Sequence, residues 1–351
     1  RRDLDIVNSF LLSQEDEVST KPGQHHRHRL QSPTMRILLI RTSALGDVVH
    51  CLPVLTEIRR HLPEAEIAWV VEQAMAPVLE GHPGLDRVIV ARLRPWRRDV
   101  WGSRREMASF VRDLRGFRAD VALDLMGNHK GGILAWLSGA PRRIGLGRAH
   151  RREAESAVWI NEPVAPVGAH AVDLALSLAP HVSGMPLEPE RVDFGGEKLF
   201  AGAPPADLGE PYLLVTPGAG WGNKVYPPAW WGRVAELLRR STGLSTRVAV
   251  APGEEHLVRA VVEASAGAAR EEPAFGLPRL ASLLRGASLV LGGDTGPIHL
   301  AHALGAPVLC VMGPTDPERH GPYGAPDRAL AVVLPCSFCY KRFGETKACL
   351  L

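Results

Sequence analysis

The stretch Gly292-Gly-Asp-Thr-Gly-Pro-Ile-His299 comes directly after the apolar run Ala287-Ser-Leu-Val-Leu291. This order indicates a buried strand, a turn of small residues and then a helix. The amino end of a helix presents unpaired N–H groups and the positive end of the helix dipole, which together suit a phosphate group. Asp294, Thr295, Gly296 and His299 lie at this turn. We predict a site for a nucleotide or another phosphate ester; the alternative is an ordinary strand-to-helix turn.

The same alternation of strand and helix patterns runs along the chain from Met35 onward. It predicts an α/β fold in which a parallel sheet is covered by helices on both faces. We expect strands at 36–40, 67–71, 87–90, 121–125, 212–216, 247–251, 287–291 and 307–312, and helices at 48–61, 106–114, from 133, 228–240, 278–284 and 297–304.

A Pro- and Gly-rich stretch interrupts this alternation and indicates two Rossmann-like halves. We expect an N-terminal domain over 35–185, a linker over 186–210 and a C-terminal domain over 211–351, with parallel sheets facing a central cleft. Residues 1–34 are polar and contain the basic cluster His25-His-Arg-His-Arg29. They are expected to be a disordered tail, or an extension upstream of a natural start at Met35.

The composition excludes several classes of protein. A formal net charge of +3 over 351 residues is too small to indicate a nucleic-acid partner. No apolar run approaches the ~18 residues of a membrane span. Cys51 and Cys310 stand in apolar contexts and are expected to be reduced core thiols, which fits a cytoplasmic protein. The remaining cysteines, Cys336, Cys339 and Cys349, are one ligand short of an ordinary zinc site.

The loop Thr42-Ser-Ala-Leu-Gly-Asp47 follows the first predicted strand. It lacks the G-x-G-x-x-G dinucleotide fingerprint, and Gly145-Leu-Gly147 is only a weak partial match that follows no predicted strand. Asp47 opens the next helix, so it is either a functional carboxylate or an acid that caps the first turn.

Two further loops follow strands of the second half. In Pro217-Gly-Ala-Gly-Trp-Gly-Asn-Lys224, Gly218 allows close approach of a ligand and Lys224 can neutralise a phosphate; the alternative is a flexible surface loop. In Ala251-Pro-Gly-Glu-Glu255, Glu254 or Glu255 could accept hydrogen bonds from ribose hydroxyls, or could simply cap a helix.

A basic and aromatic segment, Arg92-Leu-Arg-Pro-Trp-Arg-Arg-Asp-Val-Trp101, lies in the first half. Arginine suits bidentate contacts to carboxylate and phosphate, and tryptophan covers sugar or lipid faces. The alternative is a solvated charged face. The only D-x-D pattern is Asp3-Leu-Asp5, so a divalent-metal sugar-nucleotide site is unsupported.

Together these loops resemble the ADP-heptose:lipopolysaccharide heptosyltransferases of glycosyltransferase family 9. The resemblance covers nearly everything after Met35, in the heptosyltransferase I version. It rests on Met35 to His50, on Asn223-Lys224 ahead of Tyr226-Pro-Pro-Ala-Trp-Trp231, on Gly293 to His299 with Gly313-Pro-Thr-Asp316, and on Gly127-Asn-His-Lys130.

The resemblance implies a GT-B fold and inverting transfer of L-glycero-D-manno-heptose from ADP-heptose to Kdo on lipid A, with no cofactor or metal. Asp47 would be the general base, while Lys224 and the amides near Thr295 and Gly296 would stabilise the departing diphosphate. Gly218, Glu254 or Glu255, Asp294 and His299 would bind the donor. The enzyme would work peripherally at the cytoplasmic face of the inner membrane. Its acceptor-side residues would be Ser43, Gly46, Arg94, Trp96, Arg97, Arg98 and Lys130.

Two departures stand out from the family pattern. Met126 takes a position where relatives of the family often carry Gln, and we expect that the family's terminal helix, which returns to the N-terminal domain, is absent here. The alternatives to a first-heptose transferase are a transferase of a later heptose, a sugar-nucleotide epimerase of the same architecture, and a nucleotide-binding protein without catalysis.

Overall fold

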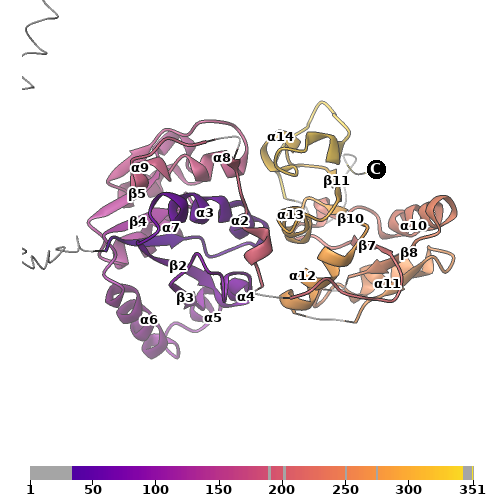
Figure 1. Cartoon of the computed structure of the whole chain (residues 1–351), viewed down its shortest axis with the longest axis horizontal. Helices are drawn as coiled ribbons and strands as arrows, with labels where there is room; N and C mark the ends of the chain where they lie inside the picture. Colours follow the sequence, from indigo (N-terminus) through magenta and orange to yellow (C-terminus); the bar gives the residue numbers. More distant parts are fainter. Residues whose placement is uncertain are drawn as a thin grey trace, which may run out of the picture. The chain divides into compact units, whose positions relative to one another are not determined.

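The computed structural model of the chain describes residues 34–188, 191–200, 203–249, 251–273, 276–342 and 350 (Figure 1). The basic cluster at 25–29 and Cys349 lie outside the described residues, so the expectations that concern them stay predictions.

The first sheet is built around β1 (Arg36–Ile40), which pairs in parallel with two neighbours. Ile37 stands opposite Ile67 on one side and Val121 on the other. The strand is almost wholly apolar because both of its faces are covered, as is usual in parallel sheets. The six strands lie in the order β3-β2-β1-β4-β5-β6. The other strands of this sheet are β2 (Glu66–Glu72), β3 (Arg87–Ala91), β4 (Val121–Asp124), β5 (Arg142–Leu146) and β6 (Glu162–Val164).

The second sheet repeats this winding. Its order is β12-β11-β10-β7-β8-β9. If β7 to β12 are renumbered 1 to 6 and the sheet is read from the β9 edge, the order is 3-2-1-4-5-6, as in the first sheet. Both halves therefore have the doubly wound 3-2-1-4-5-6 arrangement, and the predicted α/β fold with two Rossmann-like halves is confirmed. The strands are β7 (Tyr212–Thr216), β8 (Ser245–Val248), β9 (Ala269–Glu271), β10 (Leu289–Gly293), β11 (Val308–Met312) and β12 (Ala329–Ala331).

Side chains alternate between two cores along β1. Ile37 and Leu39 belong to a core that includes residues of α3 and α8, whereas Leu38 and Ile40 belong to another that includes residues of α5, α6 and α7. Helices thus cover both faces, as the alternating pattern predicts. The helices of this half are α2 (Leu45–His50), α3 (Leu52–His61), α4 (Ala76–Leu79), α5 (Leu93–Arg98), α6 (Arg104–Gly116), α7 (His129–Leu137), α8 (Ala171–Leu176) and α9 (Pro180–Ser183).

The second sheet is covered in the same way. Val215 packs with residues of α10 and α11, whereas Leu214 packs with residues of α12 and α13 in the core that also holds Ile37. That shared core connects the two halves through contacts of α2 with α13 and of α4 with α12. The helices here are α10 (Pro228–Thr242), α11 (Glu255–Glu263), α12 (Leu277–Gly286), α13 (Gly296–Ala303) and α14 (Pro317–His320).

Several expected elements differ from those observed: the strand predicted at 247–251 is β8 at Ser245–Val248, and the helix predicted from 133 is α7, which begins at His129. The single helix predicted at 48–61 is two helices, because Pro53 at the start of α3 has no N–H to continue the hydrogen-bond ladder from α2. The strand predicted at 287–291 is β10 and runs on to Gly293. A Cβ on Gly292 would lie 2.3 Å from Oγ1 of Thr216, so glycine is needed where β10 passes β7.

Other elements were not predicted. Gly145 lies inside β5, so the prediction that Gly145-Leu-Gly147 follows no strand was wrong. The segment Arg92–Trp101, interpreted as a loop, contains the helix α5. Burial of Cys51 and Cys310 as free thiols confirms their placement in the core.

Candidate active site

Three of the candidate loops lie at the carboxyl ends of strands where a sheet reverses its winding: Thr42–Asp47, the loop that ends at Lys224, and the loop that contains Asp294. In the first sheet these strands are β1 and β4, and in the second β7 and β10. Open α/β sheets bind ligands at such switch points. Thr42–Asp47 follows β1, and Asp294 to Gly296 follow β10.

The amino ends of α2 and α13 are packed against each other. A Cβ on Gly46 would lie 2.7 Å from Cδ2 of His299, and a Cβ on Gly296 would lie 2.6 Å from Cβ of Leu45. Only glycine at both positions allows this crossing. The packing places Asp47, the residue after Gly46, beside the start of α13, so the predicted base and the predicted phosphate site come together.

Asp47 is held by its own loop and by the end of β1. Its Oδ2 atom lies 2.6 Å from Nη2 of Arg41 and accepts a hydrogen bond of 3.2 Å from the N–H of Ala44. Desolvation raises the pKa of Asp47, but the charge and hydrogen bond of Arg41 outweigh it, so the pKa falls below its ordinary value. The side chain is 40% exposed, so an ionised carboxylate faces solvent.

Arg41 was not singled out from the sequence. It follows β1 directly, and its Nη1 atom also donates to the carbonyl of Leu125 at the end of β4. Arg41 therefore links the two switch-point strands of the first sheet to Asp47. The available signal was an arginine at the carboxyl end of an apolar strand, immediately ahead of a loop with a carboxylate.

Lys224 and Asp294 form an ion pair across the predicted donor site. Nζ of Lys224 lies 2.5 Å from Oδ2 of Asp294, which also accepts from the hydroxyl of Thr315 at 2.6 Å. Oδ1 of Asp294 lies 2.9 Å from Nε2 of His299. Desolvation raises the pKa of Asp294, but His299 and then Lys224 lower it far more, and the net pKa lies well below its usual range.

These contacts change how two predicted donor ligands are interpreted. His299 is 5% exposed, and its Nδ1 atom lies 3.1 Å from Nε2 of His50, so both ring nitrogens are already engaged. Both oxygens of Asp294 are engaged as well. The structure therefore places Asp294 and His299 behind Lys224, where they position the lysine, and not on a surface open to a nucleotide.

The side chain of Thr295, unlike those of Asp294 and His299, is still able to bind a ligand. It stands at the amino end of α13 without capping the helix, and its buried Oγ1 atom has no hydrogen-bond partner among the described residues. A buried hydroxyl without a partner is costly, and a bound oxyanion would satisfy it. Lys224, 4.4 Å from the ring centroid of Trp221, lies in the neighbouring loop.

The two glutamates left open by the sequence differ in position. A Cβ on Gly218 would lie 1.9 Å from the carboxylate of Glu254, so these two predicted donor residues lie together. Burial raises the pKa of Glu254 and outweighs the opposite effect of the neighbouring His256. Glu255 is exposed and accepts from the N–H of Gly253, which is the behaviour of a helix-capping acid. The geometry favours Glu254 as the ligand.

A group of histidines surrounds the contact between α2 and α13. The ring centroids of His170 and His320 lie 5.4 and 6.5 Å from that of His50. Burial lowers the pKa of His50 well below 6.5 and that of His320 to about 4. These two rings are therefore uncharged near neutral pH and pack as polar parts of the core. His50 ends the stretch Met35 to His50 on which the family resemblance rests, whereas His320 belongs to no predicted motif.

The predicted acceptor-side residues fall into two groups. Trp96 does not fit its prediction, since it is 5% exposed and packs against Phe110 with ring centroids 5.1 Å apart. The exposed aromatic residue of this segment is Trp101, at 81%. Ser43 is half-buried, and Gly46 is a packing residue. Four cations are exposed and make no ion pair with any residue that the structure describes: Arg94, Arg97, Arg98 and Lys130.

A buried ion pair shapes the loop that leads to Lys130. The side chains of Asp124 and Arg151 are both fully buried and paired, and Oδ1 of Asp124 accepts from the N–H groups of Met126 and Gly127. The hydroxyl of Thr42 faces Sδ of Met126 at 3.5 Å, which is a weak contact. The role of Asp124 was not predicted from the sequence.

Clustered metal ligands and membrane-spanning helices are both absent from the described residues. No group of three or more His, Cys, Asp or Glu side chains there is arranged to hold a metal ion. Within the same part of the chain, no helix combines the length and the apolar character needed to cross a bilayer.

Comparison with known proteins identifies the family. Glycosyltransferase family 9 (heptosyltransferase) matches residues 107–348. The lipopolysaccharide heptosyltransferase 1 of Pseudomonas aeruginosa is 34% identical over 312 residues, which cover 88% of this chain and 87% of that protein. The chain belongs to glycosyltransferase family 9. This glycosyltransferase is also 31% identical to lipopolysaccharide heptosyltransferase 1 of Escherichia coli, over 83% of its own length and 91% of the relative's.

Solved structures agree with this assignment. The glycosyltransferase matches the E. coli heptosyltransferase WaaC with ADP at a TM-score of 0.75 and 28% identity, covering 84% of this chain and 92% of that one. E. coli ADP-heptose lps heptosyltransferase II matches at a TM-score of 0.67 and 18% identity, over 90% and 94% of the two chains, and supports the fold alone. The fold is thus GT-B, as the resemblance implies, and the chain is a glycosyl-transferring enzyme.

Proposed function

We propose that this glycosyltransferase moves L-glycero-D-manno-heptose from ADP-heptose to Kdo of the lipopolysaccharide inner core, with inversion at the anomeric carbon. One observation carries the proposal: the packing of Gly46 against His299 brings the ionised Asp47 beside the amino end of α13. An inverting transfer needs such an arrangement, with a base on the acceptor side and stabilisation of the leaving group on the other.

In the proposed reaction Asp47 accepts the proton of the Kdo hydroxyl. The hydroxyl oxygen forms a bond to the anomeric carbon of the heptose while the bond from that carbon to the β-phosphate oxygen breaks, and the electron pair leaves with ADP. Arg41 keeps Asp47 ionised in the resting enzyme. It also makes the carboxylate a weaker base, so we expect proton transfer to come late in the transition state.

The departing diphosphate would be stabilised by charge and by hydrogen-bond donors. Lys224 supplies the charge, held in place by Asp294. The unpartnered hydroxyl of Thr295 and the N–H of Gly296 supply donors at the positive end of the α13 dipole. Glu254 beside Gly218 would hold the ribose. We propose that these groups replace a metal ion.

The acceptor would bind the half over 35–185 and the donor the half over 211–351, joined by the linker over 186–210. Arg94, Arg97, Arg98 and Lys130 are exposed cations at the carboxyl edge of the first sheet. An anionic acceptor of the Kdo-lipid A kind matches their charge. Peripheral binding at the cytoplasmic face of the inner membrane follows from an acceptor of this kind.

Similarity to proteins with known ligands supports the donor. The matching WaaC structure is one with ADP, and a second WaaC structure, at a TM-score of 0.74 and 28% identity, is one with ADP-2-deoxy-2-fluoro heptose. Both relatives in the family comparison bear the name heptosyltransferase 1. These names favour transfer of the first heptose over a later one.

The test is a transfer assay with ADP-heptose and Kdo-lipid A in which ADP release is followed in the presence of a chelator. Acceptor-dependent release would establish donor, acceptor and independence of metal. Asp47→Asn should lower the turnover number by about 10²–10⁴-fold with ADP affinity kept, whereas Glu263→Gln, which changes an exposed acid on α11, should match the wild type. Release without acceptor, or normal turnover of Asp47→Asn, would overturn the proposal.

A further inference from the structure

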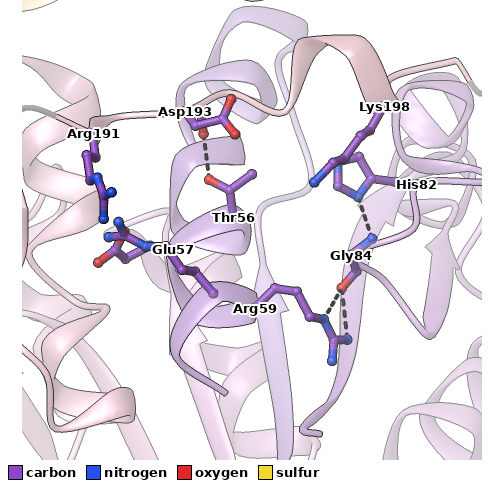
Figure 2. A pocket seen from close by; sticks show the side chains of 9 residues that line it. Thr56, Glu57, Arg59, His82, Gly84, Arg191, Asp193 and Lys198 are labelled. Atoms are coloured by element: carbon purple, nitrogen blue, oxygen red, sulfur yellow. Dashed lines mark hydrogen bonds and ion pairs between the residues drawn. The ribbon is translucent and has the colours of Figure 1, made fainter. Parts of the chain in front are cut away.

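A cavity lined by several charged residues lies at the opposite end of the first sheet from the candidate active site. Its volume is about 270 Å³, and it lies between α3, the turn at 82–84 that precedes β3, and the crossover segment at 191–198 that leads to the second half. Figure 2 shows side chains of all three segments around it. The family chemistry described above uses none of them.

His82 offers this cavity a hydrogen-bond donor. The residue is 3% exposed, and its Nδ1 atom accepts a 3.0 Å hydrogen bond from the N–H of Gly84, so the ring proton is on Nε2. Nε2 is buried and has no partner among the described residues. A Cβ at position 195 would lie 3.2 Å from Nε2, so a side chain at Gly195 would crowd this atom.

Lys198 offers a positive charge. Its side chain is exposed, and its ammonium group makes no hydrogen bond or ion pair with any residue of the described ranges. In Figure 2 it lies next to the ring of His82. Burial and then the charge of Lys198 lower the pKa of His82 to about 4, so the ring is a neutral donor at pH 7.

The other charged residues that line the cavity are already occupied. Arg59 donates to the carbonyl of Gly84 and pairs with Asp86, and Arg60 pairs with Glu57. Arg191 pairs with Glu188, and Oδ1 of Asp193 accepts from the N–H of Gly195. Each of the three lining arginines therefore has a carboxylate partner, and Lys198 and Asp193 are the lining charges that form no ion pair with any described residue. The groups left for a ligand are the Lys198 cation, the Nε2–H donor of His82 and the Asp193 carboxylate, which a ligand bound to Lys198 would have to avoid.

We propose that this cavity binds a small phosphate-bearing anion, with Lys198 as its counter-charge and Nε2–H of His82 as a hydrogen-bond donor. A phosphate fits because it accepts several hydrogen bonds at once and carries close to two negative charges. Its binding would also satisfy the buried N–H of His82, which otherwise carries a desolvation cost.

The site lies where the two halves are joined. The hydroxyl of Thr56 on α3 donates to the carbonyl of Asp193, while Arg285 on α12 donates to the carbonyls of Gly196 and Leu199. The crossover is thus tied to both halves. A ligand between His82 and Lys198 would add a further link between the crossover and the first half.

The proposal is tested by titrating orthophosphate into the full chain by calorimetry and into ¹⁵N-histidine-labelled protein by NMR. The expected result is a shift of the His82 Nε2–H signal and a dissociation constant at least tenfold weaker for Lys198→Met. Arg233→Met, which removes an exposed charge on α10, is the control and should leave it unchanged.

A comparison of two lysine variants distinguishes phosphate binding in this cavity from phosphate binding in the candidate active site. Lys224→Met removes the charge of that site, and binding that survives Lys224→Met and weakens in Lys198→Met would support the proposal. Loss of binding in Lys224→Met, unchanged binding in Lys198→Met, or a His82 signal that does not move would overturn it. The outcome is independent of whether heptose is transferred.

Discussion

A Cβ atom on Gly46 would lie 2.7 Å from Cδ2 of His299, closer than a Cβ atom normally lies to any non-bonded atom. The two residues come from α2 and α13, the helices that follow the switch-point strands of the two sheets. Their contact sets the distance between Asp47 and the amino end of α13. The absence of a side chain at Gly46 therefore allows the loop that carries Asp47 to lie close to the loop that carries Thr295.

Gly46→Ala should separate α2 from α13 and lower kcat/KM by at least tenfold, because misplacement of reacting groups by about 1 Å is enough for such a loss. Steady-state kinetics with both substrates would measure it. Gly116→Ala, at the end of α6 where a Cβ meets no atom within 4 Å, is the matched control. An unchanged kcat/KM for Gly46→Ala would show that this contact does not set the geometry.

Arg41→Met should move the acid limb of the pH profile of kcat/KM to higher pH. In the wild type Arg41 lowers the pKa of Asp47, so the base stays ionised until the pH falls below the ordinary range of an aspartate. Without the guanidinium, desolvation dominates and activity is lost at a higher pH as the carboxylate becomes protonated. The profile of Arg41→Lys, which keeps a charge, should lie between the two. Superimposable profiles would rule out this control of Asp47.

Asp294→Asn should lower the free energy of unfolding by about 3 kcal/mol, because it leaves the mostly buried ammonium of Lys224 without its counter-charge. Thr315→Val removes one hydrogen bond to the same carboxylate and should cost only about 1 kcal/mol. Urea unfolding at pH 7 measures both. Asp327→Asn, at an exposed acid, serves as control. Equal losses for Asp294→Asn and Asp327→Asn would contradict the ion-pair assignment.

Acidification should destabilise the protein through His320. Its pKa is about 4 in the folded protein against 6.5 ordinarily, so the unfolded chain takes up the proton first. The stabilising contribution is complete above pH 6.5 and falls as the pH drops toward 4, by about 2 kcal/mol between pH 7 and pH 5. His320→Gln should flatten this slope, while His181→Gln on the exposed end of α9 should not. Parallel slopes would refute the assignment.

The two tryptophans of the basic segment should behave differently. Trp96→Ala empties a core site and should cost about 3–5 kcal/mol of stability. Trp101→Ala, at an 81% exposed position, should change stability by less than about 0.5 kcal/mol but raise KM for the lipid acceptor. Thermal unfolding and acceptor kinetics separate the two effects. A stability loss for Trp101→Ala as large as that for Trp96→Ala would be inconsistent with the structure.

The sequence predicts the inner strands well and the outer strands poorly. The bounds of β1 and β7 agree with prediction because both strands are continuous apolar runs buried on two faces. Arg142–Leu146 and Glu162–Val164, which form β5 and β6, carry charged residues and were missed, because strands toward the edge of a sheet bury less of their surface.

The candidate site divides in a similar way. The ion pair between Lys224 and Asp294 agrees with the prediction that both loops belong to one phosphate site. The two residues follow β7 and β10, which are neighbouring strands. Which atoms remain free to bind a ligand could not be predicted, because this depends on side-chain orientation. Both ring nitrogens of His299 contact Asp294 or His50, whereas the Thr295 hydroxyl has no hydrogen-bond partner among the described residues. Arg41 is the clearest omission.

The identical winding of the two sheets has a consequence for how such enzymes diversify. No described strand of either sheet pairs with a strand of the other, so each half keeps its own backbone hydrogen bonding. A half exchanged between relatives would need to match the packing of Gly46 with His299, the surrounding histidines, the contacts of α4 with α12 and the crossover. Within that constraint, the half proposed to bind the donor and the half proposed to bind the acceptor can change separately, because neither supplies a strand to the sheet of the other.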